Sequence, residues 1–65
     1  MKTRINRGKL AAMLCESDMT QKALSKKSGV SKYTISAIMS GKSCSDETAQ
    51  KLSAALGMEL RDILE

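Results

Sequence analysis

A chain of 65 residues holds at most one domain, and a domain of this size buries only about 60% of the surface that its unfolded chain exposes. The sequence has no histidine, and its two cysteines, Cys15 and Cys44, are too far apart to chelate a metal as a pair, so we expect no metal site, no cofactor and free thiols in a reducing cytoplasm. No apolar run approaches the roughly 20 residues that cross a bilayer, and no signal peptide follows the basic N-terminus.

The charge is unevenly distributed along the chain. Residues 1–42 contain nine basic and two acidic residues, a net charge of +7, whereas residues 43–65 contain two basic and five acidic residues, a net charge of −3. This asymmetry favours a polyanionic partner for the first part of the chain. A basic surface that serves only solubility would show the same charge, so charge alone leaves both interpretations open.

The first expected elements are a basic arm and a helix. Residues 1–5 are expected to form a short, mobile basic arm. Asn6 is a candidate N-cap for a helix in which Leu10 and Leu14 recur at helical spacing. Ser17 and Asp18 are expected to end this helix.

Residues 20–42 are predicted to form two short helices joined by a tight turn. Thr20 suits the cap of the first helix, because its hydroxyl can accept a bond from a backbone N–H one turn on. Gly29 can adopt the positive φ that ends a helix, and Ser31 is a candidate cap for a second helix over Lys32–Ser40. Such a pair is typical of the DNA-binding helix-turn-helix, whose second helix enters the major groove.

The second helix of this pair is expected to have two different sides. At about 100° per residue, Ile35, Ile38 and Met39 form one apolar face. The opposite side contains no acid and carries mostly small and hydroxyl side chains: Tyr33, Ser36, Ala37 and Ser40. Such a face suits close approach to a DNA groove, whereas a solvated helix face usually carries several charges. A core tyrosine and an ordinary exposed face are the alternatives.

Two more helices are expected toward the C-terminus. Ser45 is a candidate cap for a helix that Gly57 ends. Residues 58–64 can form a last short helix, although Glu59 stands where a serine or aspartate cap is usual. Because no strand pattern is visible, the predicted fold class is all-α, a five-helix bundle in a single domain over residues 1–65.

Two stretches carry a family resemblance: MTQKALSKKSGVSKYTISAIMSGK at residues 19–42 and DETAQKLSAALGMELRDIL at residues 46–64. They resemble the Xre/Cro-type helix-turn-helix family, which includes the phage repressors, over roughly residues 10–64. The resemblance implies a lambda-repressor-like bundle of five helices. It also implies binding to double-stranded DNA, usually as a dimer on a two-fold related operator.

The resemblance also implies roles for particular residues. Base-reading positions fall on Lys32, Tyr33 and Ala37, flanked by Ser31, Thr34 and Ser36. Gln21 would contact a phosphate or support the base-reading side chains, and Lys42 and Ser43 would hold the DNA backbone. The dimer contact would lie near Met58 and Leu60.

The sequence departs from the family pattern in two places. Many members pair an arginine in the first helix with a glutamate late in the third, but Leu14 and Met39 occupy these positions, so we expect an apolar contact instead of an ion pair. Ala37 places a methyl group where a longer polar side chain is usual. Fewer hydrogen bonds to bases and a larger part for DNA shape are therefore expected.

The predicted function is a sequence-specific, DNA-binding transcriptional regulator, similar to Cro or a phage or prophage repressor, that acts as a homodimer in the cytoplasm. The alternative is a protein-interaction module of the same fold, such as an antitoxin or a partner-binding regulator. An enzyme is not expected, because the chain lacks histidine, a cysteine with a nearby candidate base and a glycine-rich phosphate loop. Neither a membrane nor a small-molecule substrate is expected as a partner.

Overall fold

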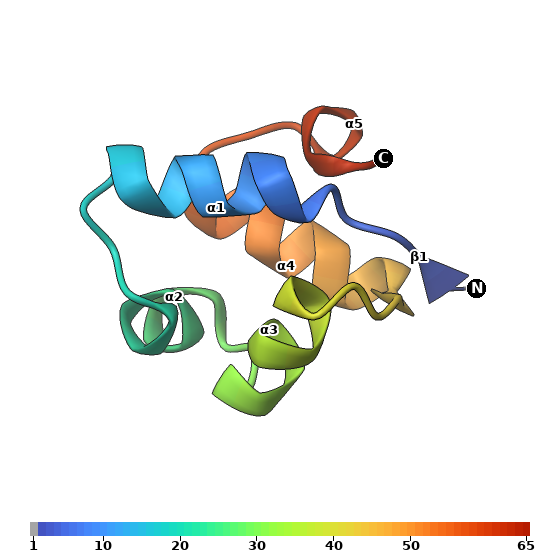
Figure 1. Ribbon diagram of the computed structural model, residues 1–65, viewed down its shortest axis with the longest axis horizontal. Coiled ribbons are helices and arrows are strands. Elements are labelled where there is room, and N and C mark those ends of the chain that lie inside the picture. Colours follow the sequence, from blue (N-terminus) through green and yellow to red (C-terminus); the bar gives the residue numbers. More distant parts are fainter. Residues whose placement is uncertain (1) are drawn as a thin grey trace.

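The computed structural model describes residues 2–65, with Met1 outside the described residues and Lys2 described by its backbone alone. The predicted five helices are confirmed, and two very short strands accompany them (Figure 1). In chain order the elements are β1 Lys2–Thr3, α1 Arg7–Glu16, α2 Gln21–Ser28, α3 Lys32–Met39, β2 Cys44–Ser45, α4 Asp46–Leu56 and α5 Leu60–Ile63.

Short polar side chains begin the helices where the sequence predicts. The side chains of Asn6, Thr20 and Ser45 each accept a hydrogen bond from a backbone N–H three residues on, over 3.1 Å in every case. Each such cap stabilises its helix by about 1 kcal/mol. Glu59 makes no cap bond, and the last helix is correspondingly shorter than the expected 58–64.

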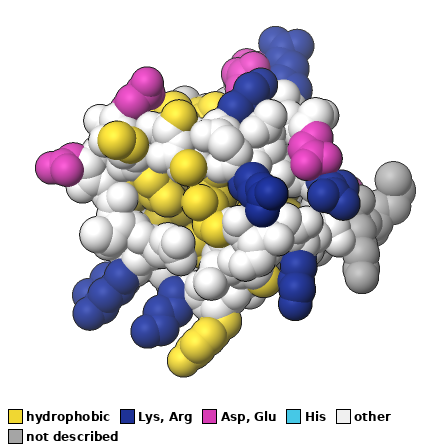
Figure 2. All heavy atoms as spheres, viewed as in Figure 1, with side chains coloured by type: hydrophobic (Ala, Val, Ile, Leu, Met, Phe, Trp, Pro, Cys, Tyr) yellow, Lys and Arg dark blue, Asp and Glu magenta, His cyan; other side chains and the backbone are white. Residues whose placement is uncertain are grey.

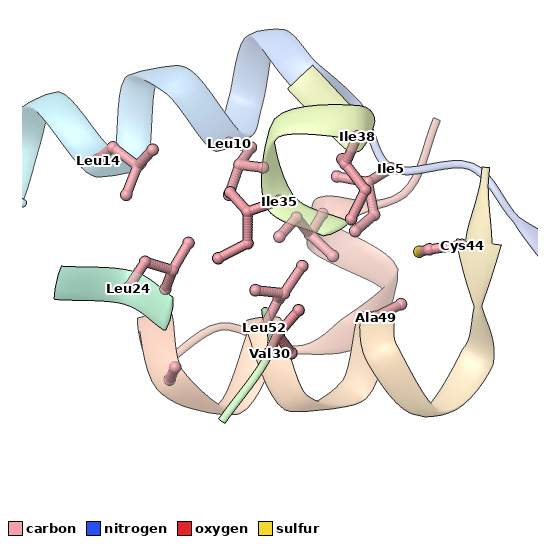
Figure 3. Close-up of a cluster of buried hydrophobic side chains, with 12 residues drawn as sticks. Ile5, Leu10, Leu14, Leu24, Val30, Ile35, Ile38, Cys44, Ala49 and Leu52 are labelled. Atoms are coloured by element: carbon pink, nitrogen blue, oxygen red, sulfur yellow. The ribbon is translucent and has the colours of Figure 1, made fainter. Parts of the chain in front are cut away.

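One hydrophobic core joins all five helices (Figure 3). Every helix supplies at least one fully buried side chain to it: Leu10, Leu24, Ile35, Ile38, Leu52 and Ile63. In Figure 3 the labelled side chains of α1, α2, α3 and α4 point toward one another. The α4 helix contacts both α2 and α5, and α1 contacts α3, so α4 and α1 together support the helix pair α2–α3.

The N-terminal segment lies against this bundle. Strand β1 pairs antiparallel with β2, with Thr3 opposite Cys44. Ile5 is 4% exposed and forms an isolated bridge with Leu64. Of residues 1–5, expected as a mobile arm, Thr3 and Ile5 are therefore engaged with the rest of the domain. The prediction of a mobile arm is therefore wrong for these two residues. Two-residue strands and one buried isoleucine are too short to produce a periodic pattern in the sequence, so this pairing could not be predicted from it.

The two sides of α3 are oriented as the helical periodicity predicts. Ile35 is 0% exposed and Ile38 1%, while Tyr33 is 78% exposed. Met39 is partly buried and packs against the core. Tyr33 is therefore a surface residue rather than a core tyrosine.

We expect Ile35→Ala to lower the free energy of unfolding by about 2–5 kcal/mol, because it removes a fully buried side chain and leaves a cavity. Tyr33→Ala, two positions away on the exposed side, is the matched control and should change it by no more than about 1 kcal/mol. Denaturant titration followed by far-UV circular dichroism measures both. Equal effects of the two substitutions would contradict the observed orientation of α3.

The two cysteines should react with a thiol reagent at different rates. Cys15 is exposed and Cys44 buried, and burial, aided by the carboxylate of Asp46, raises the pKa of the Cys44 thiol. Because the thiolate is the reactive form, native protein should show one fast and one slow thiol, and denatured protein two fast ones. Ile5→Ala should accelerate the slow reaction by loosening the N-terminal segment. Two fast thiols in the native protein would be inconsistent with a buried Cys44.

Candidate nucleic-acid interface

Two serines of α2 fix the turn that leads into α3. Gly29 ends α2 with φ +76°, and Val30, which follows it, is buried in the hydrophobic core. The hydroxyl of Ser25 donates to the carbonyl oxygen of Val30 over 2.6 Å. The hydroxyl of Ser28 accepts from the Val30 N–H over 3.2 Å and donates to the carbonyl oxygen of Leu24 over 2.7 Å. Both backbone polar groups of Val30 are thus satisfied, so the buried turn carries no desolvation penalty from them.

The N-terminal end of α3 projects two long side chains. Ser31 caps the helix by accepting from the Tyr33 N–H over 3.1 Å. Lys32 and Tyr33 are exposed, and the Lys32 ammonium lies 5.7 Å from the centroid of the Tyr33 ring. A cation–π contact at such an exposed site contributes about 0.5–1 kcal/mol. Lys32 and Tyr33 therefore extend from the protein next to each other.

The other predicted DNA-contacting residues differ in how far they are exposed. Gln21 is the exposed first residue of α2, and Ser36, Lys42 and Ser43 are exposed on α3 and beyond its end. Thr34 and Ala37 are only partly exposed. The predicted residues at the start of α3 and within it are all at least partly exposed, whereas Ile35, which lies between them in the sequence, is fully buried. We call the exposed and partly exposed residues Ser31, Lys32, Tyr33, Thr34, Ser36 and Ala37 the α3 surface.

The helix pair lies in a stretch without acidic residues. Residues 19–45 contain five lysines and neither aspartate nor glutamate. On the face drawn in Figure 2, acidic side chains appear along the upper and outer parts of the molecule. Along the lower edge, where α2 and α3 lie in Figure 1, the charged side chains that Figure 2 shows are all basic. This distribution produces a positive potential around the α3 surface and suits a polyanion.

Two arginines that the sequence analysis assigned no role reach the C-terminal end of α3. The guanidinium of Arg7 donates to the carbonyl oxygen of Met39 over 3.4 Å, and that of Arg4 to the carbonyl oxygen of Gly41 over 3.3 Å. Arg7 lies two turns before Leu14 on the same side of α1, so an arginine of α1 still contacts the end of α3, at a different position. The sequence signal for this contact is the spacing of seven residues between Arg7 and Leu14, which places both on the same side of the helix.

Met58 and Leu60, expected at a dimer contact, lie apart from the α3 surface. Both are partly buried and pack against the core. Figure 1 shows α5 on the side of the bundle opposite α3. A partner subunit bound near α5 would therefore leave the α3 surface free.

Over the described residues 2–65 there is neither a pocket nor a group of side chains placed to hold a metal ion. Within the same residues no helix has the length and apolar character needed to span a membrane.

Comparison with known proteins places the helix pair within a recognised sequence pattern. A family model described as helix-turn-helix matches residues 10–63, which include all of α2, α3 and α4. No curated protein and no solved structure gives a significant match to this chain.

Proposed function

Because the chain belongs to the Xre/Cro-type helix-turn-helix family of DNA-binding regulators, we propose that it controls transcription by binding specific sites on double-stranded DNA with α3 in the major groove. The observation that carries this proposal is the one-sided helix α3, which buries Ile35 and Ile38 and exposes Lys32 and Tyr33. These two side chains stand at the end of the helix that enters the groove in this motif.

Each residue of the α3 surface suits a different kind of DNA contact. Lys32 can donate to O6 and N7 of guanine, and the Ser36 hydroxyl can bond either base type. Tyr33 is long and exposed enough to reach a phosphate or a base edge. Ala37 offers a methyl group for contact with thymine, and its partial burial supports the expectation of few hydrogen bonds at this position.

The remaining predicted positions suit the sugar–phosphate backbone. Gln21 begins α2, and Ser31 caps the start of α3; backbone N–H groups at such helix starts favour phosphate. Lys42 and Ser43 follow the end of α3 and are exposed. Backbone contacts at both ends of α3 would fix its register in the groove, and Thr34 would flank the bases from its partly exposed position.

The chain is further proposed to bind as a homodimer through the region of Met58 and Leu60. Partly exposed apolar side chains at the end of α4 and along α5 support this: Leu56, Met58, Leu60 and Leu64. A two-fold dimer would present two copies of α3 to successive major grooves, so its operator would be two-fold symmetric.

DNA affinity should fall steeply with salt. If about six phosphates are neutralised, affinity should drop by roughly 10³-fold between 50 and 200 mM salt. Fluorescence anisotropy with a duplex selected from a random pool measures this. Absence of binding even at low salt would favour a protein-interaction module of the same fold.

Lys32→Ala and Tyr33→Ala should each weaken binding to the selected duplex by about 1–3 kcal/mol if the side chain reads a base. The loss on random duplexes should be smaller, because base contacts do not contribute there. Lys51→Ala, which removes an exposed lysine of α4 with the same change in charge, is the matched control. Equal losses on selected and random DNA would assign Lys32 and Tyr33 to the backbone instead.

Met58→Asp and Leu60→Asp should each weaken self-association by roughly tenfold or more, because each places a charge in an apolar contact. Ala54→Asp, at an exposed position of α4, is the control for added negative charge. Analytical ultracentrifugation measures the equilibrium, and circular dichroism verifies that the variants fold. A selected consensus without two-fold symmetry, together with a monomeric DNA complex, would refute the dimer.

A further inference from the structure

Basic side chains from distant parts of the chain meet at the C-terminal end of α3. Arg4 precedes α1, Arg7 begins it, and both donate to carbonyl oxygens at the end of α3. The Arg7 guanidinium also lies against Gly41, since a Cβ there would be 3.4 Å from its Nη1 atom. Lys42 follows Gly41 and is exposed. We call Arg4, Arg7 and Lys42 the α3-end cluster.

The bonds to the α3 carbonyls leave most of the arginine donors free. A guanidinium has five N–H donors, and the bond to the end of α3 uses one on each arginine. Both side chains are exposed. Arg4 also forms an ion pair with Glu65 over 3.1 Å, with the two side chains 61% and 51% exposed. An ion pair this exposed is weak, so a phosphate can replace the carboxylate.

We propose that the α3-end cluster binds the phosphate groups of the DNA strand that flanks the groove occupied by α3. This inference rests on the proposed function, and it adds Arg4 and Arg7 to the residues that contact DNA. The chemistry favours phosphate because guanidinium groups bind it with two parallel hydrogen bonds.

The packing of the N-terminal segment makes the contact a rigid one. Ile5, between the two arginines in sequence, is buried, and its neighbour Asn6 donates its backbone N–H to the carbonyl oxygen of Ile63 over 2.8 Å. The arginines are thereby fixed relative to α3 before DNA arrives. Less conformational entropy is lost on binding than with a free arm, and the cluster is tied to the register of α3.

The competing explanation is that Arg4 and Arg7 only stabilise the end of α3, where the helix dipole favours positive charge. The salt dependence of DNA binding separates the two explanations. Each phosphate contact contributes about 0.9 to the slope of log affinity against log salt. The double variant Arg4→Ala/Arg7→Ala should therefore lose about 1.8 from the slope, which makes its fall in affinity between 50 and 200 mM salt about tenfold smaller than that of the wild type. The loss should be equal on selected and random duplexes.

The chain provides a matched control for each charge. Lys51 and Glu47 form an exposed ion pair over 3.5 Å within α4, outside both the α3-end cluster and the proposed dimer contact. Lys51→Ala should leave the salt slope unchanged. Glu65→Gln, which frees Arg4, should tighten DNA binding more than Glu47→Gln does, an effect that helix stabilisation alone does not predict.

A second pair of variants guards against loss of folding. Arg4→Gln and Arg7→Gln remove the charge but keep an N–H donor for the carbonyl oxygens of Gly41 and Met39, and thermal unfolding verifies their fold. A reduced slope in these variants supports the proposal. An unchanged slope overturns it and leaves the arginines as supports of α3. Failure of the wild-type protein to bind any duplex at low salt overturns the proposed function itself, and this inference with it.

Discussion

The burial of Ile35 and Ile38 is the interaction on which the rest of the structure depends. Because both are almost completely buried, α3 can take only one rotation about its own axis, and that rotation turns Lys32 and Tyr33 outward. The turn before α3 is compatible with this orientation of the helix. Val30 of the turn is buried, and Ser25 and Ser28 form hydrogen bonds with its backbone C=O and N–H groups. A helix of only eight residues is not stable alone, so its direction comes from packing rather than from its own propensity.

The features predicted correctly from the sequence are local ones. Caps at Thr20 and Ser45, the positive φ at Gly29 and the two sides of α3 each depend on residues within one or two helical turns. Their signal is therefore contained in a short window of sequence. The candidate surface on α3 followed from the same periodicity together with the resemblance to a family, although its individual DNA contacts stay predictions.

The features that were missed are contacts between distant segments. The pairing of Thr3 with Cys44 and the contact of Arg4 with Gly41 join residues about forty positions apart, and nothing in either segment specifies its partner. These contacts also explain how α1 and the end of α3 stay in contact although Leu14 and Met39 cannot form the ion pair that is usual in the family. The loss of an ion pair there does not separate α1 from the end of α3, because Arg7 bonds the backbone of Met39 instead.

The exposure of Tyr33 has a consequence for spectroscopy. The chain contains one tyrosine and neither tryptophan nor phenylalanine, so its aromatic absorbance and intrinsic fluorescence come from a single side chain. In most proteins these signals report on the core, but here the chromophore stands on the surface of α3, away from the buried cluster. The near-ultraviolet signal of this protein is therefore a built-in reporter of whatever approaches α3, and it carries little information about the packing of the interior.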